Sequence, residues 1–377
     1  MKCSVCCSPA SNVWEIASGI IPNHYHKELK KEKKSSQGIF FCETCQTLEN
    51  VHSFSEDDLF SNYVYRTPNT SMDEEIANYL ATFINKNNIE KVVEVAGNNG
   101  IFAKKVIDLL DKDIDITIVD KVKLDVNDSR IHHINSFLEE NNRDLFSKIK
   151  SDLVIVRHAL AHNKDIKKFL HNIIDILNPK FIYIENASLL STYEKNDFSQ
   201  LYSEHFYQIS PKTISTLAQN NNFFLNEINY FEIHNGSFGA LISKEMNEFK
   251  ISNSESISSE ELKSKISAWS KSVEDFWNIL KTKNKKIAVW GCSAKFLFTY
   301  SALNLSSIKK LSYVIDSTPE KEGLYAPGTS VKVIGEDKVN NLEDDLLFVI
   351  GARNFEQHIT SKILTLNPKA HVFIPPF

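Results

Sequence analysis

Residues 91–100 read KVVEVAGNNG, a short apolar run that ends in a turn with two glycines. A continuous apolar run is typical of a strand in a parallel sheet that is covered on both faces. Gly97 and Gly100 allow the backbone to approach a bound molecule closely. Because a helical pattern follows, the stretch predicts a strand, a tight turn and a helix of an α/β sheet.

Three more apolar runs continue this alternation, DITIV at 115–119, DLVIV at 152–156 and FIYI at 181–184. An antiparallel hairpin should follow, because residues 224–233 and 238–243 flank Asn235-Gly236, a strong hairpin signal. The sequence therefore predicts a parallel sheet that closes on a hairpin, over residues 71–246.

A second α/β unit is expected near the carboxyl end. Residues 247–283 are predicted to form a serine- and glutamate-rich linker followed by a helix. The segment 284–377 then carries four further runs, KIAVWG, LSYVID, LLFVIG and HVFIP. Their alternation with helical stretches predicts a second doubly wound domain, so the fold class is α/β.

The first 70 residues have a different character, because five of the six cysteines fall within residues 3–45. Cys3/Cys6 and Cys42/Cys45 form two C-x-x-C pairs, and four thiolates complete a tetrahedral zinc site. A redox C-x-x-C or a set of reduced thiols are the alternatives. With no coordination position left open, zinc would be structural, and its removal is expected to unfold this domain without altering the chemistry.

Charge and hydropathy exclude several classes of function. A net charge of -5 argues against the broad electropositive surface that binds nucleic acid. The lysine-rich run at 27–34 is interrupted by Glu28 and Glu32 and is interpreted as a solvated face. No apolar stretch is long enough to span a membrane, and the amino terminus lacks the apolar core of a signal peptide. We therefore expect a cytoplasmic protein; its oligomeric state stays open.

Ligands of an open α/β sheet bind beyond the carboxyl ends of its strands. At that edge Glu94, Asn98 and Asn99 offer polar contacts, and Asp120 is placed to accept hydrogen bonds from ribose hydroxyls. The turn lacks G-x-G-x-x-G, so S-adenosylmethionine fits it better than a dinucleotide. His158 follows the next strand and is expected at the same edge.

Residues 187–209 form a long excursion after the fourth run, and such loops are often functional lids. It carries Tyr202, Glu204 and His205, and a carboxylate beside an imidazole can raise the basicity of the ring. His162 is interpreted as a hydrogen-bond donor to substrate. A surface loop with incidental polar residues is the alternative.

Taken together, the chain resembles the zinc-binding, S-adenosylmethionine-dependent sugar C-methyltransferases that act on nucleotide-linked deoxysugars. The resemblance covers nearly the whole chain. Its motifs are the two C-x-x-C pairs, YVYRT at 63–67, VVEVAGNNG at 92–100, RHALAH at 157–162, YSEHFYQIS at 202–210, HNGS at 234–237, WGCSAK at 290–295, IDSTPEKEGLYAPGT at 315–329 and ARNFEQHI at 352–359.

This resemblance implies a central cofactor domain, with the zinc domain packed against it and the carboxyl-terminal domain holding the nucleotide sugar. It makes His205 the base, supported by Tyr202 and Glu204, and places Tyr65 and His162 at the sugar. The expected substrate is a thymidine diphosphate 4-keto-6-deoxyhexose, methylated at C3 through an enolate. An O- or N-methyltransferase and a zinc-containing RNA-binding or RNA-modifying protein are the alternatives.

In the carboxyl-terminal domain we expect Lys295 to meet the diphosphate and Asn354 to touch the base or sugar, with Asn235 also at the substrate. The sequence departs from the family pattern at four positions. Ser203 replaces His, Asn99 replaces Asp, Asn235 interrupts H-G-G-S, and Arg353 replaces Trp. These departures concern the identity of the substrate more than the type of reaction.

Overall fold

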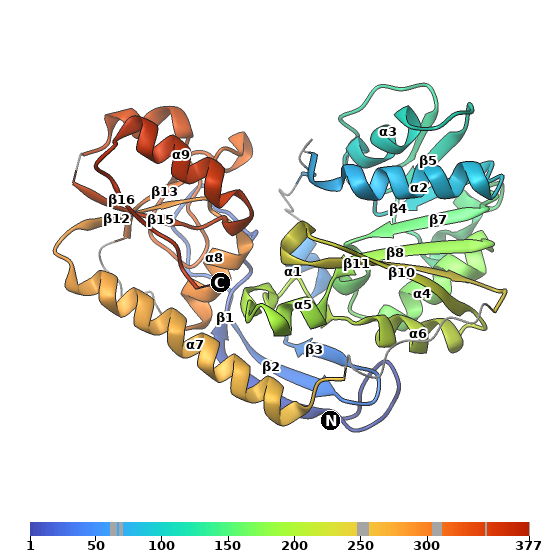
Figure 1. Ribbon diagram of the computed structural model, residues 1–377, viewed down its shortest axis with the longest axis horizontal. Helices are drawn as coiled ribbons and strands as arrows, with labels where there is room; N and C mark the ends of the chain where they lie inside the picture. The colour runs from blue at the N-terminus through green and yellow to red at the C-terminus, as the bar shows by residue number, and fades with distance from the viewer. Residues whose placement is uncertain (61–65, 68–70, 247–255, 304–310, 344, 377) are drawn as a thin grey trace.

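The computed structural model describes residues 1–60, 66–67, 71–246, 256–303, 311–343 and 345–376, and contains three sheets (Figure 1). The small amino-terminal sheet is antiparallel, and the two larger sheets are built mainly from parallel strands. Among the described residues, no helix is both long and apolar enough to cross a membrane. The mixed α/β class predicted from the sequence is confirmed.

The amino-terminal sheet has the order β1-β2-β3-β9. Its first three strands follow one another in the chain: β1 (Ser11–Gly19), β2 (Ser35–Cys42) and β3 (Thr47–Val51). The fourth strand, β9 (Tyr207–Gln208), comes from the long excursion of the central domain and pairs with β3 through Leu48 and Glu49. The excursion is thus part of the sheet that the cysteine-rich segment builds.

The central sheet has the order β10-β11-β8-β7-β4-β5-β6. Five strands are parallel, and β10 and β11 close the sheet as an antiparallel hairpin. The bounds are β4 (Lys91–Val95), β5 (Asp115–Val119), β6 (Ile131–Ile134), β7 (Leu153–Arg157), β8 (Phe181–Ala187), β10 (Phe224–Phe231) and β11 (Ser237–Ser243). The four apolar runs and the hairpin are confirmed, whereas β6 was not predicted.

Helices cover both faces of the central sheet, as its continuous apolar strands require (Figure 1). One face packs against α2 (Glu74–Lys86) and α3 (Ile101–Asp108), and the other against α4 (Ile166–Leu177) and α6 (Pro211–Gln219). Two short helices, α1 (Glu56–Phe60) and α5 (Leu189–Glu194), lie in the connections. Ser210 and Pro211 begin α6 with a capping box, as the sequence indicates.

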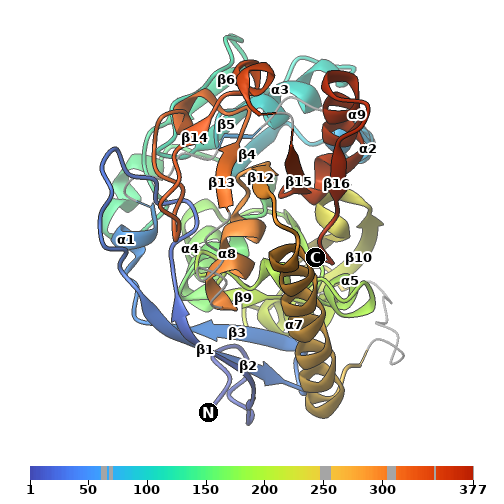
Figure 2. The same ribbon diagram turned by 90° about the vertical axis from the view of Figure 1, so that its left-hand side faces the viewer.

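The carboxyl-terminal sheet is parallel and has the order β14-β13-β12-β15-β16. Its elements are β12 (Lys286–Trp290), α8 (Ala294–Ala302), β13 (Leu311–Ile315), β14 (Val333–Ile334), β15 (Leu346–Ile350), α9 (Glu356–Leu366) and β16 (His371–Phe373). The long helix α7 (Ser259–Thr282) precedes it and runs past β1, as Figures 1 and 2 show. Trp269 and Trp277 of α7 share one apolar core with Ile16 of β1 and Phe296 of α8. The helix therefore joins the two outer domains.

Candidate functional site

The cysteine pairs meet where two turns face each other. The Sγ atoms of Cys3, Cys6, Cys42 and Cys45 all lie within 4.8 Å of one another. The Cys3–Cys45 and Cys6–Cys42 Sγ separations are both 3.5 Å. Four thiolates about 2.3 Å from a tetrahedral zinc ion lie about 3.8 Å apart, so the arrangement fits the metal that the sequence predicts.

This cluster is continuous with the central domain. Cys3, Cys42 and Cys45 are buried in the same apolar core as Val93 and Val156 of the central sheet. A zinc ion there would hold the turn at Cys3–Cys6 against the turn that joins β2 to β3.

The end of β3 holds the backbone of the YSEH segment, residues 202–205. The side-chain amide of Asn50 donates to the carbonyls of Leu201 and Tyr202 at 3.2 and 3.3 Å. His52 Nε2 lies 2.8 Å from the carbonyl oxygen of Ser203. The segment that carries the candidate base is thus positioned by the cysteine-rich domain.

Glu204 also faces that domain. It is fully buried, and its carboxylate accepts a hydrogen bond from the backbone N–H of Asn23 at 3.0 Å. Burial raises the pKa of Glu204 to about 7. The interpretation that Glu204 raises the basicity of the His205 ring is wrong, because this carboxylate reaches Asn23, while a different group holds the ring.

That group is the carbonyl of Gln200, which lies 2.8 Å from His205 Nδ1. Because a carbonyl oxygen only accepts, Nδ1 carries the proton and Nε2 keeps a lone pair. Tyr202 donates its hydroxyl to this Nε2 at 2.9 Å. The His162 ring lies 4.6 Å from the His205 ring, edge to face. The structure therefore brings His205, Tyr202 and His162 together; Tyr65, the fifth predicted catalytic residue, lies outside the described residues.

The electrostatics favour a neutral His205. Burial lowers the pKa of His205 well below its ordinary value of 6.5, and repulsion from His162, His158 and Lys295 adds to the effect. The hydrogen bond to Gln200 opposes it. A neutral imidazole, whose Nε2 lone pair is held by no group other than the Tyr202 hydroxyl among the described contacts, is the form that can accept a proton.

The predicted cofactor edge is built around Asp120. Its Oδ2 accepts from the backbone N–H of Asn98 at 2.8 Å, and its Oδ1 accepts from that of Val122 at 2.7 Å. Gly100 has a φ of 81°, a conformation that favours glycine. A Cβ atom on Gly97 would lie 2.9 Å from Ile118 Cγ2, which leaves little room for another residue. Both positions therefore favour glycine, and this allows the tight turn between β4 and α3.

The two asparagines of this turn also contact the segment that precedes α2. Asn98 Oδ1 accepts from the Thr67 backbone N–H at 3.1 Å, and Asn99 Nδ2 donates to the Thr67 carbonyl at 2.9 Å. Asn99 also donates to Asp125. These contacts hold the turn against the chain at Thr67.

Glu94 lies beneath the turn and is 3% exposed, with Oε2 lacking a hydrogen-bond partner among the described residues. Burial raises the pKa of Glu94 to about 8. At neutral pH the group is therefore mainly a carboxylic acid that can donate a hydrogen bond.

Glu185 is a central residue of this edge that the sequence analysis did not select. Its carboxylate contacts Arg157 Nε at 2.5 Å and His158 Nε2 at 2.8 Å. Arg157 also lies 3.5 Å from Asp73 and stacks on Phe102. His158, predicted to bind the cofactor, is thus oriented by a buried carboxylate. The sequence feature that could have identified Glu185 is its position as a charged residue directly after the apolar run FIYI.

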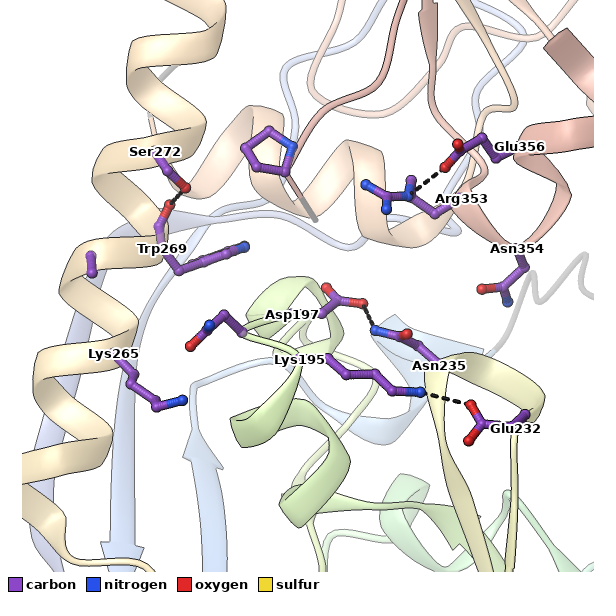
Figure 3. A pocket seen from close by; sticks show the side chains of 13 residues that line it. Lys195, Asp197, Glu232, Asn235, Lys265, Trp269, Ser272, Arg353, Asn354 and Glu356 are labelled. Atoms are coloured by element: carbon purple, nitrogen blue, oxygen red, sulfur yellow. Dashed lines mark hydrogen bonds and ion pairs between the residues drawn. The ribbon is translucent and has the colours of Figure 1, made fainter.

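A cavity of about 820 Å³ opens where the central domain, α7 and the carboxyl-terminal domain meet (Figure 3). Residues from all three parts line it: Lys195, Asn196, Asp197, Glu232, Asn235, Lys265, Ala268, Trp269, Ser272, Arg353, Asn354, Glu356 and Pro376. The set includes two of the three predicted substrate residues, Asn235 and Asn354. The third, Lys295, forms an ion pair at 2.9 Å with Asp197 in the cavity wall.

Residues 237–377 match the C-methyltransferase C-terminal domain family. The chain is a methyltransferase, and its carboxyl-terminal segment is similar to this family. The matched segment runs from β11 to the carboxyl terminus and includes Lys295, Arg353 and Asn354, whereas His205 and the four clustered cysteines precede it. No curated protein matches the chain.

Solved structures with similarity to this chain include two methyltransferases. The mitomycin 7-O-methyltransferase MmcR is 13% identical with a TM-score of 0.35, over 46% of this chain and 54% of that one. The match thus spans about half the length of MmcR. Magnesium protoporphyrin IX methyltransferase from Synechocystis PCC 6803, solved with bound SAH, is 10% identical with a TM-score of 0.36, over 46% of this chain and 83% of that one.

Proposed function

We propose that this methyltransferase transfers the methyl group of S-adenosylmethionine to a carbon beside the ketone of a nucleotide-linked deoxysugar. The observation that carries the proposal is the lone pair of His205 Nε2, held in place by Gln200 and facing the hydroxyl of Tyr202. A carbon acid needs a positioned neutral base, and this is the group that supplies one.

Asp120, Gly97 and Gly100 are the residues that would hold S-adenosylmethionine. The partly buried carboxylate of Asp120 ends β5, where acidic residues accept hydrogen bonds from ribose hydroxyls. Glu94 adds a protonated acid below the turn. Bound at this edge, the cofactor supplies an electrophilic methyl group.

Replacing Asp120 by Ala is expected to weaken binding of S-adenosylmethionine by about tenfold or more, because two charge-assisted hydrogen bonds are lost. Asp115→Asn is the control, since Asp115 lies at the opposite end of β5 and is mostly exposed. Isothermal titration calorimetry measures both affinities. Equal affinities for the D120A and wild-type proteins would remove Asp120 from the cofactor site.

The reaction begins when His205 Nε2 takes the proton from the carbon beside the ketone. The C–H electron pair moves into an enolate, and the enolate oxygen takes the charge. When Nε2 takes the substrate proton, the Tyr202 hydroxyl is released from it and can donate to this oxygen instead. A donor placed in a site closed to water can contribute several kcal/mol. S-adenosylmethionine held by the Asp120 turn would supply the methyl group to this carbon, and its sulfur would keep the electron pair of the broken S–CH₃ bond.

The cavity in Figure 3 is our proposed site for the nucleotide diphosphate. Lys265 lies on its wall and contacts the carbonyl of Tyr193 at 3.0 Å, so it can reach an anion without first breaking an ion pair. Lys195 is paired with the exposed Glu232. Lys295 was predicted to meet the diphosphate, but its ammonium already pairs with the buried Asp197, which favours Lys265 for that role.

The pH dependence of the reaction follows from the lowered pKa of His205. A base must be unprotonated, so activity is lost only as pH falls through the pKa of the folded protein. We therefore expect kcat/KM to be constant near neutral pH and its acid limb to lie below pH 6.5. Initial rates between about pH 5 and pH 8 test this; a half-maximal rate above 6.5 contradicts it.

The proposal is tested by incubating the protein with S-adenosylmethionine and a thymidine diphosphate 4-keto-6-deoxyhexose in deuterated buffer, followed by mass spectrometry. Gain of one methyl group, or deuterium at the carbon beside the ketone, is expected. Methylation of an analogue that lacks the ketone would indicate an oxygen or nitrogen acceptor. Salt-dependent RNA binding without any reaction would favour the RNA-binding alternative.

A further inference from the structure

Asp197 gathers contacts from three parts of the molecule. Its carboxylate accepts from the backbone N–H of Ser199 at 3.1 Å, from Asn235 Nδ2 at 2.9 Å and from Lys295 Nζ at 2.9 Å. Its side chain is 5% exposed and that of Lys295 is 15% exposed. Ser199 and Asn235 both lie in the central domain, Asn235 in the connection between β10 and β11. Lys295 lies on α8 of the carboxyl-terminal domain.

The same carboxylate caps the 3-10 turn Phe198–Gln200, since it bonds the N–H of Ser199 at the start of the turn. The last residue of this turn is Gln200, whose carbonyl holds Nδ1 of His205. Gln208 Nε2 donates to the same carbonyl at 3.2 Å. Only Phe198 and Ser199 therefore lie between the carboxylate of the ion pair and Gln200, whose carbonyl fixes the proton on the candidate base.

We propose that Lys295 and Asp197 are positioning residues, which couple docking of the carboxyl-terminal domain to the orientation of His205. Lys295 does not bind the diphosphate in this proposal. Lys295 fixes the Asp197 carboxylate through the ion pair, and this carboxylate caps the turn Phe198–Gln200. The turn then places the Gln200 carbonyl against the His205 imidazole. This inference rests on the proposed function, because it assigns the pair to the base of that reaction.

Two physical features support this assignment. A buried carboxylate that loses its cation is left uncompensated, so removal of Lys295 should shift or protonate Asp197 and loosen the cap. A turn of three residues has few internal bonds to absorb such a shift. A displacement of the base by about 1 Å costs up to about 100-fold in rate.

The test compares Lys295→Met, Lys295→Arg and Asp197→Asn with the control Lys362→Met. Lys362 also forms an ion pair in the carboxyl-terminal domain, with Glu336, and does not line the cavity. Deuterium exchange into the keto sugar, in the presence of S-adenosylhomocysteine, reports the base step alone. We expect K295M and D197N to lower the maximal exchange rate by about 10- to 100-fold, with KM changed much less, and K295R to restore part of it.

A raised KM with an unchanged maximal rate in K295M would show that Lys295 binds substrate, and would overturn the proposal. Thermal unfolding shows whether each variant folds. If K295M does not fold, D197N, which conserves the shape of the side chain, tests whether the ion pair positions His205. An exchange rate in D197N equal to that of the wild type would also overturn it.

A second readout needs no substrate. Nitrogen-15 spectra of histidine-labelled protein, with His205 assigned by the H205Q variant, report the hydrogen bond at Nδ1. The resonance should change in K295M and D197N and stay unchanged in K362M. If the wild type exchanges no nucleotide sugar, the proposed function fails, and these spectra still test the coupling; an unchanged His205 resonance defeats the coupling alone.

Discussion

Replacing His205 by Gln is expected to lower both methyl transfer and substrate deuterium exchange by about 10²- to 10⁴-fold, the usual contribution of a general base. Gln keeps a polar side chain of similar reach but has no nitrogen lone pair that accepts a proton. The side-chain contacts found for His205 among the described residues are with Tyr202, Gln200, Gln208 and His162 and none is with the Asp120 turn, so binding of S-adenosylmethionine should persist. Rates from mass spectrometry and affinities from calorimetry measure the two quantities separately.

His171→Gln provides the matched control for this substitution. His171 is a histidine of α4 whose ring nitrogen lies 3.4 Å from the Asn221 side chain, remote in the fold from the YSEH segment. Its replacement should leave both rates unchanged. A rate for H205Q within a few fold of the wild type would show that another group removes the proton.

The second large effect is expected from loss of the cysteine cluster. Replacing Cys45 by Ser removes one ligand of a zinc site, and structural zinc sites contribute about 10 to 16 kcal/mol in small peptides. The strand β3 begins two residues after Cys45 and carries Asn50 as well as the pairing with β9. We therefore expect zinc, order of the YSEH segment and substrate exchange to be lost together.

Three measurements follow this chain of effects: zinc content, amide hydrogen exchange of residues 201–208, and deuterium exchange into the substrate. Cys7→Ser is the control, since Cys7 is exposed and lies outside the cluster. Faster amide exchange in C45S but not in C7S is expected. A C45S protein that lacks zinc yet retains wild-type substrate exchange would contradict the coupling of the two domains.

This expectation replaces the one drawn from the sequence, that removal of zinc unfolds the first domain without altering the chemistry. The sequence places the cysteines more than 160 residues before β9, since Cys45 is the last of the four and β9 begins at Tyr207, so nothing in its local pattern connects them. The structure pairs Leu48 with Gln208 and Glu49 with Tyr207. A structural metal can then affect the base through the backbone, without taking part in the reaction.

Several features could be predicted because they depend on nearby residues. Residues 91–95 form a strand whose apolar side chains point to both faces of the sheet, as in a strand that is buried on both sides. Gly100 lies in the turn after it, at a position with a positive φ that favours glycine. The cysteine cluster could also be predicted from nearby residues. Each C-x-x-C pair places two ligands on one short turn, so two such turns complete the set of four. The β6 strand, with the sequence IHHI, was missed because it is half exposed at the edge of the sheet.

The sequence by itself determined the order of strands and helices, the two glycine turns and the identity of the groups that can ligate metal or accept a proton. Only the tertiary structure decided which group each of them meets. The Glu204 carboxylate accepts a hydrogen bond from Asn23, and the Gln200 carbonyl, not Glu204, accepts from the His205 ring. Lys295 forms an ion pair with Asp197. The physical reason is that a strand or turn follows from the spacing of neighbouring side chains, whereas a buried polar contact depends on which distant segment supplies its partner.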